Sequence, residues 1–209
     1  MTSPRDLTVT SASALLKTGK LSAVELLQSC FQAIDAHNDS IEAWALLDRE
    51  GALRSAHRCD SEIKLGRWQG PLHGIPVGVK DIIFTKGMRT EAGSDTWAGF
   101  VPTFDATVVV KLKQAGAIVM GKTHTTEFAF MDPAPTRNPW NINATPGGSS
   151  SGSGAAVSAR MCPVALGTQT GGSVLRPAAY NGVVGFKPQH GRISTYGIVP
   201  ISPVLDHVG

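Results

Sequence analysis

The rest of this chain is organised around residues 145–180, TPGGSSSGSGAAVSARMCPVALGTQTGGSVLRPAAY. This segment contains two glycine-serine loops, residues 147–154 and 171–173. The stretch between them predicts a short helix at 155–161 and then a buried strand at 163–166. A helix of about nine residues spans roughly 14 Å, and a strand of about six residues returns over roughly 20 Å. Both loops are therefore expected at the same edge of a sheet.

Ser149 in the first loop and Ser173 in the second are then expected to face each other across a cleft. A Gly/Ser-rich tract is often a flexible linker, but here the serines run directly into a helix pattern of small residues. Residues 148–152 also match the G-x-S-x-G turn of α/β-hydrolases, which needs a strand directly before it. Residues 141–146 instead predict a turn and loop, which disfavours that interpretation.

The composition indicates one globular body. The chain has 209 residues, of which 42% are hydrophobic and 17% charged, and its formal net charge is +3. This is enough for one sizeable core. The basic residues are dispersed, so we expect neither a nucleic-acid nor a membrane partner. With no secretory leader or long apolar run in the sequence, a soluble cytoplasmic protein is expected, with a homodimer as one option.

The cysteines and histidines suggest no metal site. Cys30, Cys59 and Cys162 are odd in number and widely spaced, so we expect reduced thiols and no disulfide framework. The six histidines show no ligand spacing such as H-E-x-x-H. We expect no metal and no cofactor.

The N-terminal part of the chain predicts helices. Apolar residues recur at helical spacing in residues 11–17 and 23–37, and Ser22 with Glu25 fits a capping box at the start of the second helix. A further helical run is expected over residues 43–58. Such helices usually pack a core or cover the edge of a sheet.

The remainder predicts short buried strands at 75–79, 117–120 and 182–187, and a helix at 104–115. Residues 116–123 also match a phosphate-binding loop. That loop needs its four middle residues as an irregular cradle between a strand and a helix, whereas here they are themselves the predicted strand. We therefore expect no nucleotide site.

Lys80 follows the predicted strand at 75–79, where side chains commonly project into a site. Beside Asp81 it could simply form a solvated ion pair. Alternatively its apolar flanks bury it, and burial disfavours the ammonium form. A neutral lysine is a usable general base.

The second glycine-serine loop has the pattern that acyl transfer needs. Successive amides at Thr170, Gly171, Gly172 and Ser173 can turn inward to bind an anion such as the oxyanion of a tetrahedral intermediate. A serine nucleophile also needs a base to accept its proton. Lys80 is the candidate, with Ser149 as a hydroxyl relay between the two.

Three motifs together resemble those of the amidase signature family. They are GVKD at 78–81, PGGSSSG at 146–152 and GTQTGGS at 167–173, in the order and spacing of that family. The resemblance covers the chain from about residue 5 onward. It implies an α/β fold with a mixed central β-sheet flanked by helices, and hydrolysis of a small carboxamide through a serine acyl-enzyme.

The resemblance also implies roles for residues. The family's Ser-cisSer-Lys triad carries over to Ser173 as nucleophile, Ser149 as bridging serine and Lys80 as base, with a cis peptide between Gly148 and Ser149. No metal or cofactor takes part, and the expected partner is a small-molecule amide.

Two departures from the family pattern concern the second loop. Gln169 stands where the family often has Asp, and Leu175 stands where it often has Arg, with Arg176 one position later. This version is similar to malonamidase-type members, whose arginine at that position binds a substrate carboxylate. Arg can grip a carboxylate bidentately, so Arg176 is either a substrate-binding residue or a structural arginine at the end of a loop.

Family members usually exceed twice this length, so we expect residues 1–209 to be the N-terminal portion of a single amidase signature domain, truncated at the C-terminus. Residues 1–65 would form a helical segment and 66–209 part of the catalytic core. An amidase is the leading expectation. The alternatives are the A subunit of a glutamyl/aspartyl-tRNA amidotransferase and an inactive truncated fragment.

Overall fold

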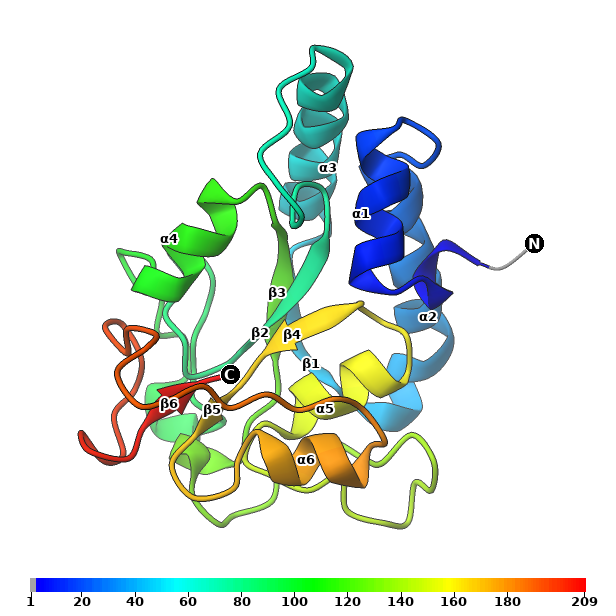
Figure 1. Cartoon of the computed structure of the whole chain (residues 1–209). Helices are drawn as coiled ribbons and strands as arrows, with labels where there is room; N and C mark the ends of the chain where they lie inside the picture. The colour runs from blue at the N-terminus through cyan, green and yellow to red at the C-terminus, as the bar shows by residue number, and fades with distance from the viewer. Residues whose placement is uncertain (1–2) are drawn as a thin grey trace.

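The computed structural model describes residues 3–209, whose centre is a four-stranded sheet (Figure 1). In the order β1-β3-β2-β4, its strands are β1 (Trp44–Leu47), β3 (Ile118–Thr123), β2 (Pro76–Lys80) and β4 (Val164–Leu166). β1 runs antiparallel to β3, whereas β2 is parallel to β3 and to β4. The mixed sheet implied by the family resemblance is confirmed.

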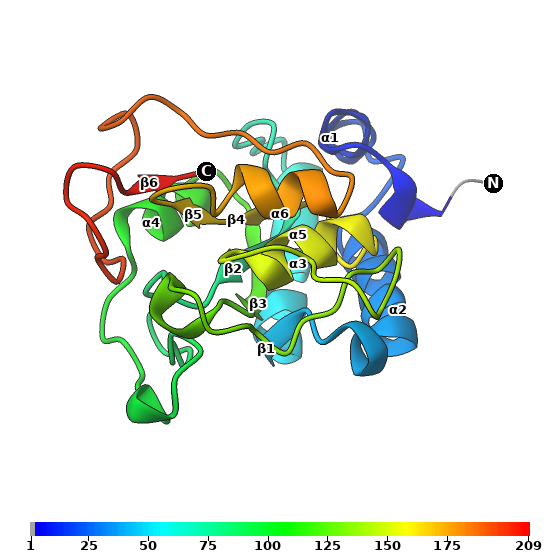
Figure 2. The same cartoon turned by 90° about the horizontal axis from the view of Figure 1, so that it is seen from below.

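Helices surround this sheet, with α1, α2 and α3 together on one side and α4 on the other (Figure 1). Viewed from below, α6 lies over α5, next to a two-stranded ladder of β5 and β6 (Figure 2). Among residues 3–209, no helix has the length and apolar character that crossing a membrane requires. The helices are α1 (Val9–Lys17), α2 (Ala23–Ile41), α3 (Arg49–Lys64), α4 (Thr107–Gln114), α5 (Ser151–Ser158) and α6 (Leu175–Tyr180), with 3-10 turns η1 (Pro4–Asp6), η2 (Asp95–Trp97) and η3 (Glu127–Ala129), and the ladder strands are β5 (Thr168–Gln169) and β6 (His207–Val208).

The sheet separates two apolar cores. Ile118 and Met120 of β3 pack with buried residues of α1, α2, α3 and α5. Val119, between them, packs instead with Val79 of β2 and Val109 of α4. Successive side chains of a strand point to opposite faces, so this alternation gives the sheet two covered faces and explains why β2 and β3 are buried along their whole length.

The start of α2 is fixed by two sets of acceptors. Ser22 and Glu25 form the predicted capping box, in which the serine hydroxyl accepts from the Glu25 amide and the carboxylate accepts from the Ser22 amide. Asp60 on α3 accepts from the Ala23 amide at 2.6 Å and from the Val24 amide at 3.2 Å. The capping prediction is confirmed, and the Asp60 contact ties α3 to α2.

The helical run predicted over residues 43–58 is wrong at its start. Residues 44–47 form β1, and α3 begins only at Arg49, with the Asp48 side chain accepting from the Gly51 amide as N-cap. Four apolar residues in a row do not distinguish a strand from a buried helix, and pairing with β3 decides for the strand. The first 65 residues thus contribute a strand to the sheet, and the division at residue 65 stays a prediction.

Two further expectations are corrected near the glycine-serine loops. The first loop ends earlier than predicted, because α5 begins at Ser151. Residues 182–187 form no strand in the described chain. The Val183 amide bonds instead to the Ala178 carbonyl, at 2.9 Å, and Gly185 packs against the Ala178 side chain. This close approach to α6 takes the backbone away from any ladder, and α6 itself was not predicted.

Gly152 allows α5 to approach the end of the sheet, and we predict that Gly152→Ala is destabilising. A Cβ there would clash with the Ala43 carbonyl oxygen and the His124 amide nitrogen, which are backbone atoms and cannot rotate away. Overpacking of this kind costs about 2 kcal/mol, which lowers the Tm by roughly 4 to 8 °C for a chain of this size. Thermal unfolding by circular dichroism measures the shift. Gly171→Ala is the matched control because a Cβ there meets no atom within 4 Å, and equal melting of both variants would contradict the clash.

Candidate active site

Lys80 is the last residue of β2, and its side chain is completely buried. Its ammonium nitrogen lies 2.7 Å from Ser149 Oγ and 2.9 Å from Thr168 Oγ1, and it donates a hydrogen bond to each. Ser149 precedes α5 and Thr168 begins β5, so three separate elements meet at this nitrogen. The predicted pairing of Lys80 with Ser149 is present.

Burial without a close counter-ion changes the chemistry of Lys80. Desolvation lowers the pKa of the Lys80 amine well below 10.5, and the negative charge of Asp206 only partly opposes it. In residues 3–209, no carboxylate oxygen lies within salt-bridge distance of this nitrogen. Burial therefore shifts Lys80 towards the neutral amine, and a neutral amine can accept a proton.

Ser149 is held by its backbone. The Gly148–Ser149 peptide bond is cis, as the family resemblance implied. The Ser149 carbonyl accepts from the Thr126 amide at 3.2 Å, and the side chain is 1% exposed. The hydroxyl is thereby directed at the amine of Lys80.

Ser173 lies in the second loop, and the two loops touch through their backbones. The Ser150 amide, next to Ser149, donates to the Ser173 carbonyl at 3.2 Å. This meets the expectation that both loops lie at one edge. In the described part of the chain, the hydroxyls of Ser149 and Ser173 are not themselves hydrogen-bonded to each other.

The loop before Ser173 has the free donors that an anion needs. Within residues 3–209, the backbone amides of Gly171, Gly172 and Ser173 have no hydrogen-bond acceptor. Thr170, the other oxyanion candidate, is held by its hydroxyl, which donates to Asp206 Oδ1 at 2.6 Å. The loop can therefore offer amide donors without first breaking bonds.

Gln169 organises this loop, a role that sequence reasoning missed although it noted the residue as a departure. Its Oε1 accepts from the Val174 and Leu175 amides, both at 2.9 Å, and its Nε2 donates to the Gly171 carbonyl at 2.8 Å. An aspartate could accept the first two bonds but not donate the third. The glutamine thus forms hydrogen bonds with the backbone on both sides of Ser173.

Arg176, on the first turn of α6, reaches back to the first loop. Its Nε and Nη2 donate to the Gly148 carbonyl oxygen at 2.9 and 2.7 Å. The guanidinium also lines a cleft of about 570 Å³ with Thr126, Ser151 and the loop at 130–148. Lys80, Ser149 and Ser173 do not line this cleft, but Gly148 and Ser151 on either side of Ser149 do.

Thr168 lines a second hollow, of about 190 Å³. Thr170 and Asp206 are among its other polar residues, and Ile82 and Val199 are among its apolar ones. The Asp206 carboxylate is already satisfied by Thr170 and by the amides of residues 201 and 202, at 2.8 and 2.9 Å. Asp206 therefore acts as a fixed anion near Lys80, and nothing in the local sequence signalled it.

Cys59, Glu62 and His73 offer ligand atoms within 4.8 Å of one another, a grouping that the sequence did not predict. The Gln69 amide donates to His73 Nδ1 at 3.1 Å, which places the ring proton on Nε2, facing Glu62 Oε2 at 3.0 Å. Coordination through Nε2 would move that proton to Nδ1, against the Gln69 N–H. Burial also raises the pKa of the Cys59 thiol to about 11, so the cluster fits a hydrogen-bonded core better than a metal.

The fold and site define an α/β protein in which a buried lysine, the serine hydrogen-bonded to it and a glycine-rich loop meet at one end of the central sheet. The chain belongs to the Amidase family, whose sequence model matches residues 25–209. Thus the family expected from the motifs is confirmed.

Proteins of this family share both sequence and structure with the chain. It is 45% identical to the A subunit of the glutamyl-tRNA(Gln) amidotransferase from Desulforapulum autotrophicum. The aligned region covers 98% of this chain and 43% of that subunit. The peptide amidase of Stenotrophomonas maltophilia has a TM-score of 0.93 and 41% identity, covering 98% of this chain and 44% of that one. A fatty acid amide hydrolase has a TM-score of 0.92 and 28% identity, covering 99% and 38%. The chain thus spans less than half the length of these relatives.

The unpaired amine of Lys80 leads to a prediction about pH. Because its folded-state pKa is lowered, the proton binds more tightly to the unfolded chain, and this cost to stability is greatest below the folded-state pKa and vanishes above about 10.5. Wild type should therefore gain stability relative to Lys80→Met as pH rises towards 10.5, by at most about 1.4 kcal/mol per pH unit.

Urea unfolding of both proteins at several pH values measures this difference, and the contributions of the buried thiols cancel in the comparison. Lys111→Met, which removes an exposed lysine of α4, is the control and should track wild type. Parallel curves for wild type and Lys80→Met would contradict a depressed pKa for Lys80.

Proposed function

We propose that the protein is an amidase that hydrolyses a small carboxamide to a carboxylate and ammonia. The observation that carries this proposal is the 2.7 Å contact between Ser149 Oγ and the buried amine of Lys80, which has no carboxylate partner within residues 3–209. Family membership supports the reaction type. The chain covers less than half the length of its relatives. The activity is therefore proposed for the site formed by Lys80, Ser149 and Ser173.

The proposed reaction begins when Ser173 Oγ attacks the amide carbonyl carbon. Its proton passes to Ser149, whose own proton passes to the neutral amine of Lys80. The negative charge that forms on the carbonyl oxygen is stabilised by amides of the loop at 170–173, which are available as donors.

Collapse of this intermediate breaks the C–N bond, and the proton held by Lys80 returns through Ser149 to the departing ammonia. The acyl group is then an ester of Ser173. A water molecule attacks this ester and gives up its proton along the same route to Lys80. The bond between the acyl carbon and Ser173 Oγ then breaks, the proton returns through Ser149 to Ser173 Oγ, and the acid leaves and ionises to the carboxylate. The same relay therefore serves both halves of the reaction.

Arg176 is proposed to favour substrates that carry a carboxylate. Two of its donors hold the Gly148 carbonyl, and the third nitrogen, Nη1, is left for a ligand in the cleft that Arg176 lines. One guanidinium nitrogen is still a charge-assisted donor. Arg176 can therefore bind a substrate carboxylate through Nη1 while Nε and Nη2 stay bonded to Gly148. The carboxylate would then be held by one guanidinium nitrogen and not by two.

A second candidate function is that of an amidotransferase A subunit, which works with partner subunits. Its support is the 45% identity to the A subunit of a glutamyl-tRNA(Gln) amidotransferase. Turnover that depends on added partner subunits would favour it over a free-standing amidase. A cytoplasmic location suits both candidates, because all three cysteines are free and buried thiols.

The main test is single-turnover ammonia release from a panel of small amides that includes malonamate and propionamide. We expect release that rises with pH as Lys80 loses its proton, and a loss of about 1000-fold or more in Ser173→Ala. Lys111→Met, which removes an exposed lysine of α4, is the control and should match wild type. No release from a protein that circular dichroism shows to be folded would reject the proposal and favour an inactive fragment.

The Arg176 proposal is tested by Arg176→Leu on charged and neutral amides. A carboxylate clamp predicts that KM rises mainly for malonamate, by roughly 10-fold or more for one lost charge-assisted contact. If Arg176 only holds Gly148 in place, malonamate and propionamide lose kcat/KM equally. Steady-state kinetics with both substrates separates the two roles.

A further inference from the structure

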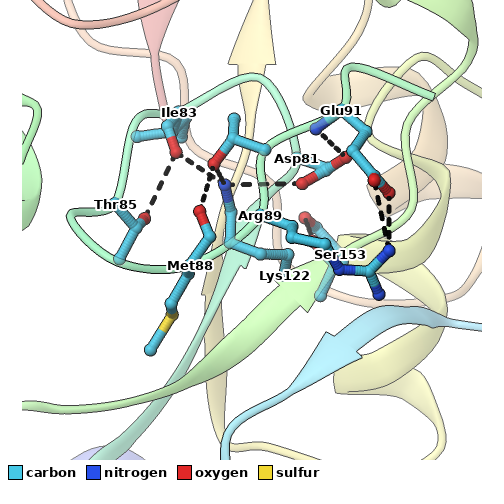
Figure 3. A network of polar contacts seen from close by, with 10 residues as sticks. Asp81, Ile83, Thr85, Met88, Arg89, Glu91, Lys122 and Ser153 are labelled. Carbon is cyan, nitrogen blue, oxygen red and sulfur yellow. Dashed lines mark hydrogen bonds and ion pairs between the residues drawn. The ribbon is translucent and has the colours of Figure 1, made fainter. Parts of the chain in front are cut away.

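Lys122 is a second buried lysine, and the proposed reaction does not use it. It lies on β3 with its side chain fully buried. Its ammonium donates to the Ile83 carbonyl at 2.8 Å and to Thr90 Oγ1 at 2.6 Å, and it lies 3.4 Å from Asp81 Oδ1 (Figure 3). We call Lys122 and these three residues the Lys122 clamp.

In the described chain, the side-chain partners of Lys122 all come from residues 81–90, the segment that directly follows Lys80. The Ile83 amide donates to the Lys80 carbonyl at 3.0 Å, so Ile83 is bonded to Lys80 on one side and to Lys122 on the other. The Asp81 amide donates to the Thr123 carbonyl at 3.0 Å. The clamp therefore fixes the turn in which the backbone of Lys80 ends.

Lys122 cannot act on the site by direct contact. In the register of β2 and β3, it is paired with Val79, whereas Lys80 is paired with Thr123. Side chains alternate along a strand, so Lys80 and Lys122 point to opposite faces of the sheet. Any influence of Lys122 on Lys80 passes through the backbone at the end of β2.

The two lysines also differ in the groups that surround them. Burial lowers the pKa of Lys122 to about 8, and the nearby Asp81 carboxylate limits the fall. Asp81 in turn accepts from the Glu91 amide at 3.0 Å (Figure 3). Lys122 can thus act as a cation that pairs with Asp81 in the segment at 81–90. Lys80 has two hydroxyl partners, and its burial shifts it towards the neutral amine.

We propose that Lys122 is a positioning residue for Lys80. Its ammonium bonds residues 81–90 to β3 and so fixes the backbone conformation at Lys80. The Lys80 side chain is then held in one orientation, between Ser149 and Thr168 and shielded from water. The inference rests on the proposed function in that it takes Lys80 as the base. A displacement of about 1 Å at such a group can slow a reaction by roughly 100-fold.

The alternative is that the clamp only stabilises the fold, and the charge-free double variant Lys122→Met with Asp81→Asn separates the two roles. Removing one partner would leave a buried charge unpaired, whereas removing both charges is often tolerated. Asn at 81 can still accept from the Glu91 amide. The double variant is therefore expected to fold while lacking the clamp.

The first readout is the pKa of Lys80, followed by NMR of lysines labelled at Cε. The groups that face this amine are the Ser149 and Thr168 hydroxyls, with Asp206 as the charge acting on it. Asp81 and Lys122 are removed together, so the net charge is unchanged. We expect the pKa of Lys80 to rise by about one unit as the loosened strand end admits water.

The second readout is the rate at which Ser173 reacts with a fluorophosphonate, which needs no turnover. It should fall between about 10- and 100-fold in the double variant. The control is Lys113→Met with Asp105→Asn, the same exchange at an exposed ion pair beside α4. This control should match wild type in both readouts.

A folded double variant with the wild-type Lys80 pKa and wild-type Ser173 reactivity would overturn the proposal. If that variant does not fold, Thr90→Val removes only one bond of the clamp, and it should shift both readouts in the same directions by less. Unchanged values in folded Thr90→Val would then overturn it. If wild-type Ser173 does not react at all, the proposed function fails, and the Lys80 pKa alone decides on the clamp.

Discussion

The structure depends on the burial of one amine at the end of a parallel strand. Lys80 can be buried because two hydroxyls accept its hydrogen bonds, and among residues 3–209 no carboxylate pairs with its amine, which suits the base that we propose. The surrounding elements serve this arrangement: β2 carries the lysine, the first loop brings Ser149 and β5 brings Thr168. An isolated buried ammonium is costly, so the same burial that positions the group also drives it to the neutral form.

Adjacent strands show how environment sets the role of a side chain. Lys80 and Lys122 are both fully buried, one residue apart in register, on opposite faces of the sheet. Lys122 has Asp81 as its counter-ion, whereas in the described part of the chain the amine of Lys80 is hydrogen-bonded to two hydroxyls. Environments that push two equal groups to different protonation states often separate a structural role from a chemical one.

The sequence predicted local features well where a single segment decides them. The capping box of Ser22 and the strand ending at Lys80 depend on neighbouring residues, and both are present. It failed where a distant partner decides. Residues 44–47 become a strand because β3 pairs with them, and residues 182–187 do not because they bond to α6. Short apolar runs carry no information about which partner they will find.

By itself, the sequence determined which chemical groups are available and in what order, because the motifs around Lys80, Ser149 and Ser173 specify residue types and turns. Only the tertiary structure brought Lys80 to Ser149, 69 residues away, and to Thr168, 88 residues away. It alone also gave Gln169, Asp206 and Lys122 their partners. The physical reason is that hydrogen-bond geometry and desolvation depend on which elements pack together, and no local pattern records that.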